Sequence, residues 1–323
     1  MRSSNNTIIL TLLTAFASLA IAQAPSDPAL PSYKRTSGIS GNLNSIGSDT
    51  MNNLMSYWAE EFKKNYPKVN VQVEGKGSST APPALIARTA QLGPMSRLMK
   101  NSEIDQFEHV FGYPPRVVRV AIDAMAIYVN KDNPLQSVSL RQLDAIFSRT
   151  RYGGYPQDVT LWGQLGLAGR WAQRPISLYG RNSASGTYGY FKEHALFRGD
   201  FKNIVKEQPG SGAVVHGVTQ DLDAMGYSGI GYVTSGVRTL ALKSNDDRAP
   251  VEPNHHNVLS CQYPLSRFLY VYVNKNPTQP LDPLVYEFLK FIFSHEGQQI
   301  VIKDGYLPVT VEMAREELAK LSE

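Results

Sequence analysis

The 323-residue sequence contains a single cysteine, Cys261, so no disulfide can form within the chain. The sequence also lacks a large excess of charge of either sign, since 32 Lys and Arg residues stand against 28 Asp and Glu residues and the formal net charge is +4. The basic residues are scattered and form no stripe of the kind that binds nucleic acid. The first shortage excludes a scaffold held by disulfides, and the second leads us to expect no nucleic-acid partner.

No apolar run reaches the ~20 residues that a membrane-spanning helix needs. The run at residues 8–17 follows Arg2 and precedes the small residues Ala20 and Ala22. A basic start, a short apolar core and a small-x-small end predict a secretory signal peptide over residues 1–22, cut after Ala22. Because no cysteine lies at this cleavage site, we expect no lipid anchor and no membrane insertion, but a monomer in the periplasm.

The rest of the composition, 42% hydrophobic and 19% charged, is typical of a globular protein, and the length predicts two domains. Two long apolar runs, residues 117–129 and 263–273, both end in an Asn-Lys sequence followed by proline. We interpret them as paired strands that cross between two lobes. After a lead at residues 23–36, lobe I then comprises residues 37–125 and 267–323, and lobe II residues 126–266.

The most informative stretch, residues 181–196, lies between a predicted strand and a predicted helix. Arg181 precedes Ser185, Gly186 and Thr187, which form the turn into the helix. Hydroxyls and free amides at a helix start, together with a guanidinium, suit a small oxyanion. The alternative is an ordinary capped helix with a surface arginine.

The same order of strand, Gly/Ser/Thr turn and helix occurs at residues 47–50 and 77–80. The first of these turns opens an amphipathic helix at residues 51–66, with Leu54, Trp58 and Phe62 on one face. In open α/β sheets, strand ends and the N-termini of the following helices form the ligand crevice. Three such turns in one chain therefore favour an anion site.

These motifs resemble the periplasmic phosphate-binding proteins of Pst-type phosphate ABC importers over nearly all of the mature chain. The matching segments are residues 47–50, 77–79, 96–97, 181–187, 229–232 and 263–273. The most specific is an arginine four residues before Ser-Gly-Thr. The resemblance implies an α/β protein with the type II periplasmic-binding-protein fold, in which two lobes, each with a central sheet, are joined by two crossing strands and close over phosphate.

The resemblance also implies a binding protein without enzymatic activity, catalytic residues, cofactor or metal. Its partners are inorganic phosphate and the membrane permease of the importer. Carried over by motif, the phosphate-binding residues are Thr50, Ser79, Arg181, Ser185, Gly186 and Thr187.

One position departs from the family pattern. Some members have a carboxylate after the serine, where it accepts the proton of phosphate, whereas this chain has Arg97. Asp123, within a buried strand, is our first candidate for the acceptor and Asp49 the second. Alternatively, Asp123 forms an ion pair with Arg97 or Arg119, and Asp49 is a simple helix cap.

An acceptor carboxylate predicts that phosphate binds far better than sulfate. Phosphate keeps a proton near neutral pH, with a second pKa of ~6, whereas sulfate has none to donate. Another tetrahedral oxyanion, such as sulfate, molybdate or arsenate, is the alternative ligand. A serine hydrolase is the alternative activity, although the sequence lacks the G-x-S-x-G pattern.

Overall fold

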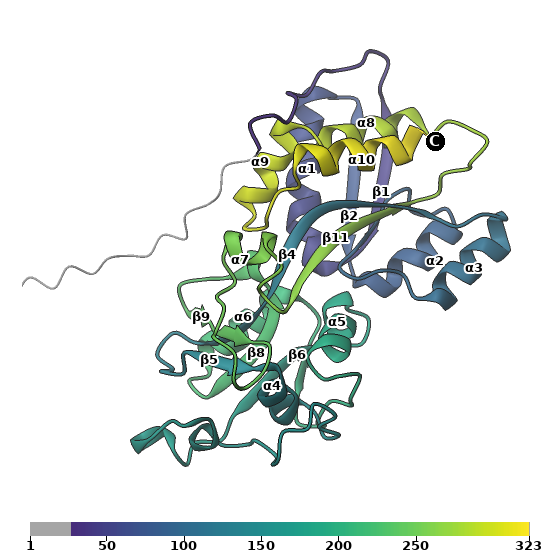
Figure 1. Cartoon of the computed structure of the whole chain (residues 1–323). Helices are drawn as coiled ribbons and strands as arrows, with labels where there is room; N and C mark the ends of the chain where they lie inside the picture. Colours follow the sequence, from purple (N-terminus) through teal and green to yellow (C-terminus); the bar gives the residue numbers. More distant parts are fainter. Residues whose placement is uncertain (1–26, 323) are drawn as a thin grey trace, which may run out of the picture.

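The computed structural model describes residues 27–322, so the predicted signal peptide at residues 1–22 lies outside the described residues. Two α/β lobes are joined by two long neighbouring strands (Figure 1). These are β4 (Arg116–Asn130) and β11 (Ser266–Val273), which pair antiparallel and confirm the predicted crossing strands. All side chains of β4 from residue 120 onward are buried, as expected for a strand that is covered on both faces.

Lobe I is built around a short parallel sheet with helices packed against it (Figure 1). Strand β1 (Gly41–Gly47) pairs with β2 (Val69–Gly75), and β3 (Gly93–Met95) pairs with β11. The short 3-10 helices η1 (Asp49–Met51) and η2 (Ser78–Thr80) follow β1 and β2. The longer helices are α1 (Asn52–Asn65), α2 (Ala81–Ile86), α3 (Asn101–Phe111), α8 (Pro283–Ile292), α9 (His295–Lys303) and α10 (Val311–Ser322).

Helix α1 forms for the reason that its sequence indicates. Leu54, Trp58 and Phe62 recur every four residues and are fully buried, so the predicted apolar face is confirmed. This face meets α8 and α9 from the C-terminal part of the chain. The start of α1, immediately after η1, is thereby fixed at the end of β1.

Lobe II contains the other strands and helices. Strand β8 (Ala224–Gly229) pairs antiparallel with β4, and β6 (Ser177–Arg181) lies parallel between β8 and β7 (Lys206–Gln208). Strand β9 (Val237–Thr239) also pairs with β4, while β5 (Ser137–Ser139) and β10 (Ala241–Lys243) form a separate pair. The helices are α4 (Leu140–Phe147), η3 (Trp162–Leu165), η4 (Gly169–Trp171), α5 (Gly186–His194), α6 (Ser211–Gln220), η5 (Ile230–Tyr232) and α7 (His255–Leu259).

The sheets of the two lobes share strand β4, which gives the continuous order β3-β11-β4-β8-β6-β7. Residues 116–124 of β4 pair with β11, whereas residues 125–129 pair with β8. The strand therefore changes partners near the middle of the molecule, where the two lobes meet. The precise lobe limits at residues 125 and 267 stay a prediction.

Helix α5 is held against the lobe II sheet by stacked aromatic rings. The rings of Phe191 in α5 and Tyr227 in β8 are parallel, with centroids 3.9 Å apart. The Tyr227 hydroxyl accepts a hydrogen bond from the backbone nitrogen of Arg181 at 3.2 Å. Through Tyr227 the end of β6 is therefore fixed relative to α5, so the residues of the Arg181 stretch are positioned together.

Candidate functional site

The turns after β1, β2 and β6 meet where the two lobes face each other. Thr50 Oγ1 in lobe I lies 2.9 Å from Thr187 Oγ1 in lobe II, within hydrogen-bond distance. Gly186 is equally close to lobe I, because a Cβ atom on it would lie 2.3 Å from Ser78 Oγ and 2.6 Å from Ser96 Oγ. The structure therefore brings first-turn residues of η1, η2 and α5 together, and first-turn amides have no acceptor within their own helix.

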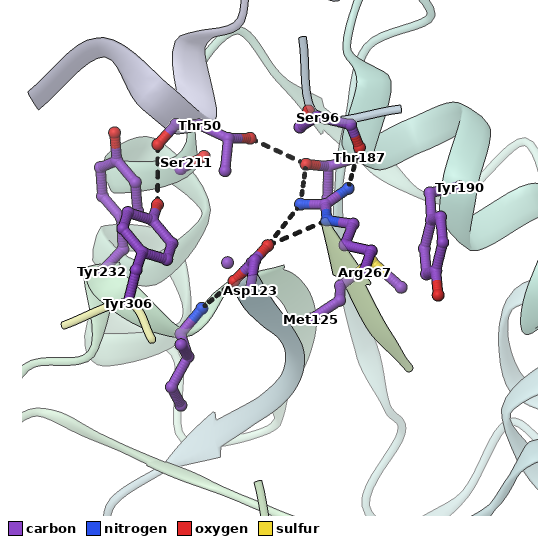
Figure 2. A network of polar contacts seen from close by, with 12 residues as sticks. Thr50, Ser96, Asp123, Met125, Thr187, Tyr190, Ser211, Tyr232, Arg267 and Tyr306 are labelled. Carbon is purple, nitrogen blue, oxygen red and sulfur yellow. Dashed lines mark hydrogen bonds and ion pairs between the residues drawn. The ribbon is translucent and has the colours of Figure 1, made fainter. Parts of the chain in front are cut away.

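A buried network of charged groups continues from Thr187 (Figure 2). Arg267 Nη2 donates to Thr187 Oγ1 at 2.9 Å, and Arg267 Nη1 donates to the Ser96 carbonyl oxygen at 2.9 Å. Asp123 Oδ2 accepts from Arg267 Nε at 2.9 Å and from Nη2 at 2.7 Å. Asp123 Oδ1 accepts from the Ile230 amide at 3.1 Å. The guanidinium thus connects the carboxylate in β4 with the hydroxyl pair between the lobes.

The ion pair of Asp123 is with Arg267, so the alternative of a pair with Arg97 or Arg119 is wrong. Arg97 pairs instead with Glu103 through two bonds of 2.7 Å. Arg119 contacts two glutamates of α10. Both arginines are therefore engaged within lobe I, and neither reaches the buried strand position.

We did not predict a role for Arg267, although the sequence holds a signal for it. Arg267 lies inside the apolar run at residues 263–273, which predicts a strand. Asp123 lies in the same way inside the apolar run at residues 117–129. A charge in such a run needs a partner, because burying an unpaired charge is costly. In the antiparallel register the two residues lie directly opposite each other.

Arg181 forms a second polar cluster, next to the first. Its Nη1 donates to Ser211 Oγ at 2.7 Å, and its Nη2 donates to the Pro209 carbonyl oxygen at 3.1 Å. Nη2 also lies 3.2 Å from Asp49 Oδ2 of lobe I. Burial lowers the pKa of Arg181 below the usual arginine value, and the Asp49 carboxylate opposes this shift. The predicted charged residue is thus paired across the lobe boundary.

Asp49 does not cap its own helix. The N-cap of η1 is Ser48, and no side chain makes a capping hydrogen bond there. The carboxylate of Asp49 instead accepts from the Ser211 amide of α6 at 2.7 Å. The capping alternative is therefore wrong for η1, and Asp49 reaches a helix of the other lobe.

The two predicted serines have different surroundings. Ser79 Oγ accepts from Arg97 Nη2 at 3.1 Å, and the Ser79 amide donates to the Ala184 carbonyl oxygen of lobe II at 3.1 Å. Ser185 is the N-cap of α5, where its hydroxyl accepts from the Thr187 amide at 3.1 Å. Ser78 rather than Ser79 lies at Gly186. Phosphate contacts of Ser79 and Ser185 stay predictions.

The combined site is almost completely removed from solvent. Thr50, Thr187 and Asp123 are at most 1% exposed. Arg181 Nε and Ser48 Oγ are buried and have no hydrogen-bond partner among residues 27–322. Charges and hydrogen bonds are stronger in such a low-dielectric region, and an unsatisfied buried donor is costly. The arrangement can therefore stabilise a small anion that accepts several hydrogen bonds.

The part of the chain that the structure describes contains no group of three or more His, Cys, Asp or Glu side chains placed to hold a metal ion. None of the helices within residues 27–322 combines the length and the apolar character needed to cross a membrane.

Comparisons with known proteins agree with this architecture. A family model described as the PBP superfamily domain matches residues 32–296. The chain is 56% identical to the phosphate-binding protein PstS of Pseudomonas aeruginosa over 312 residues, and this match covers 97% of each of the two chains.

Solved structures with a similar fold point to the same group. A putative phosphate ABC transporter substrate-binding protein from Clostridium perfringens, solved with bound phosphate, is 26% identical and has a TM-score of 0.71, covering 84% of this chain and all of that one. A possible phosphate-binding protein from Planctomyces limnophilus is 26% identical with a TM-score of 0.62, covering 88% and 98% of the two chains. The chain belongs to the PBP superfamily and, within it, to the family of the PstS phosphate-binding proteins.

Proposed function

We propose that this chain binds inorganic phosphate between its two lobes and delivers it to the membrane permease of a phosphate ABC importer. The observation that carries the proposal is the contact of Thr50 with Thr187 across the lobes, beside the Arg267 guanidinium and the first turn of α5. The PstS relative and the phosphate-bound Clostridium perfringens structure support phosphate as the ligand.

The chemistry of the site matches a tetrahedral anion. The starts of η1 and α5 present first-turn amides, and the N-terminus of a regular helix carries about half a positive charge. Threonine hydroxyls and a guanidinium add further donors, and hydrogen bonds to charged groups are the strong ones. Arg181 Nε and Ser48 Oγ, which have no partner among the described residues, are the further donors that we assign to the ligand.

We assign the phosphate proton to Asp123. Thr50 and Asp123 approach the same glycine, since a Cβ on Gly229 would lie 3.1 Å from Thr50 Cγ2 and 3.2 Å from both Asp123 oxygens. A carboxylate here accepts the proton of monohydrogen phosphate, whereas sulfate has no proton to donate and meets the carboxylate as a like charge. Mismatches of this kind give discrimination of about 10⁴ to 10⁵.

The protein acts as a receptor and not as an enzyme in this proposal, and it needs no cofactor. We place it in the periplasm, where the signal peptide predicted for residues 1–22 directs it. Capture in a closed cleft and release at the permease require the two lobes to open and close reversibly. Strands β4 and β11 are the connection between the lobes about which this movement takes place.

Calorimetric titration of the mature chain with phosphate, sulfate and arsenate at pH 7 tests the function. We expect phosphate to bind tightly, arsenate to bind comparably because it keeps a similar proton, and sulfate to bind weakly. Equal binding of phosphate and sulfate contradicts the assignment of Asp123. Failure of all three anions to bind contradicts the proposed function as a whole.

A further inference from the structure

We propose that Asp49 is an interlobe latch, a residue of lobe I whose carboxylate binds a preformed receptor in lobe II and stabilises the closed state. The receptor consists of Arg181 and the N-terminus of α6. The proposal rests on the proposed function in that phosphate is the ligand enclosed by closure. It removes Asp49 from the candidates for accepting the phosphate proton.

The first half of the receptor is a helix start without a cap of its own. The N-cap of α6 is Gly210, and no side-chain capping bond comes from it. The Asp49 carboxylate, 162 residues earlier in the chain, accepts from the Ser211 amide at 2.7 Å. A Cβ on Gly210 would lie 3.0 Å from Asp49 Oδ1, so a side chain there crowds the carboxylate. A carboxylate at this place satisfies a free amide and meets the positive end of the helix dipole.

The second half is the buried Arg181. Its guanidinium is held inside lobe II by Ser211 Oγ and the Pro209 carbonyl oxygen, both neutral groups. The carboxylate of Asp49, 3.2 Å from Nη2, supplies the negative charge. Because a buried charge without a counter-charge is strongly unfavourable, Arg181 favours any lobe arrangement that brings Asp49 into place.

A third contact joins the same segment to lobe II. The Tyr232 hydroxyl donates to the Asp49 carbonyl oxygen at 2.9 Å. Thr50, the next residue, is held within lobe I by the Tyr306 hydroxyl, which donates to its carbonyl oxygen at 2.7 Å (Figure 2). When Asp49 is seated in its receptor, Thr50 is therefore positioned against Thr187.

The latch sets how tightly the anion is held without contacting it. The apparent affinity of a protein is its intrinsic affinity multiplied by the fraction in the competent state, and the latch raises the closed fraction. Asp49 Oδ2 is already occupied by the Ser211 amide and Arg181. The residue consequently tunes release but leaves the choice between phosphate and sulfate to other groups.

The test is the variant Asp49→Asn, which keeps the shape and removes the charge. We expect its affinities for phosphate and arsenate to fall by the same factor, about 10- to 100-fold as for loss of a charge-assisted contact. The loss appears as faster dissociation in stopped-flow measurements, with little change in association. Sulfate binding does not improve.

The matched control is Asp223→Asn. This residue also pairs with an arginine, Arg174, at 2.5 and 2.9 Å, but both partners belong to lobe II. We expect its anion affinities and rates to equal those of the unmodified protein.

Unchanged anion affinity in Asp49→Asn overturns the proposal, and so does stronger sulfate binding, which shows that Asp49 faces the anion. Hydrogen exchange gives a readout at the latch itself, since in the variant the Ser211 amide donates to a neutral amide oxygen in place of a charged carboxylate, which is a weaker hydrogen bond. We expect faster exchange in the first turn of α6, and equal exchange in both proteins overturns the latch. If the unmodified chain binds no anion, the proposed function fails while the exchange comparison still decides on the latch.

Discussion

Asp123 and Arg267 lie directly opposite each other on the antiparallel strands β4 and β11, and one carboxylate oxygen accepts from two guanidinium nitrogens at 2.9 and 2.7 Å. These are the strands that join the lobes. The same guanidinium donates to Thr187 Oγ1, so the buried ion pair connects the crossing strands to the site. Stability and ligand binding are therefore expected to depend on this pair together.

Removal of one partner of this pair should be strongly destabilising. Arg267→Met leaves the Asp123 carboxylate buried and uncompensated, and we expect a loss of about 3–5 kcal/mol in the free energy of unfolding. The double variant Asp123→Leu/Arg267→Met should recover much of this loss, because no charge remains buried. Urea denaturation measures the effect in each protein. A double variant less stable than Arg267→Met contradicts the expectation.

Gly186→Ala should weaken phosphate binding although alanine favours helix. Its Cβ would lie 2.3 Å from Ser78 Oγ, so α5 must move away from lobe I or the Ser78 hydroxyl must leave its hydrogen bonds with Ser96. We expect a loss of about 10- to 100-fold in affinity, equivalent to the usual cost of overpacking. Gly189→Ala, in the same helix, is the matched control, since its Cβ meets only the flexible Arg97 side chain, with Cδ at 3.5 Å and Nε at 3.9 Å. Calorimetry should find the control close to the unmodified protein, and equal losses in both variants contradict a role for close approach at Gly186.

Arg181→Ala should weaken phosphate binding by about 100-fold or more while the protein remains folded. The substitution removes the buried guanidinium, which pairs with Asp49 in the unmodified protein. It also removes the Arg181 Nε donor, which we assign to the ligand. Arg174→Ala, which removes a partly exposed lobe II pair, serves as the control and should bind normally. Calorimetry measures binding, and circular dichroism verifies the fold. Normal binding by Arg181→Ala shows that the site lies elsewhere.

Asp304 should make the protein less stable as the pH rises from about 4 to about 7. Burial raises the pKa of its carboxyl to about 7, and its Oδ2 has no hydrogen-bond partner within residues 27–322. The folded protein thus binds a proton that the unfolded chain releases near pH 3.9, so the free energy of unfolding falls across this window. Urea denaturation measures the free energy of unfolding of the unmodified protein and of Asp304→Asn, and the difference between the two proteins should grow from pH 4 to pH 7. A difference that does not change with pH contradicts the buried neutral carboxyl.

The local elements were well predicted, as α1 and the crossing strands illustrate. Four-residue spacing of Leu54, Trp58 and Phe62, and long apolar runs, are properties of neighbouring residues. Helix α6 was not predicted, because Gly212 and Gly217 lower its helix propensity. Its packing explains the second glycine, since a Cβ on Gly217 would lie 2.4 Å from the Tyr179 ring.

The sequence by itself determined helix α1, the apolar strands and the turns that carry Thr50, Gly186 and Thr187, because caps and periodicity act over a few residues. Only the tertiary structure decided the partners of the charged groups. Asp123 meets an arginine 144 residues away, and Asp49 meets an amide 162 residues away. Such pairs depend on strand register and on how the lobes pack, which residues close in sequence do not specify.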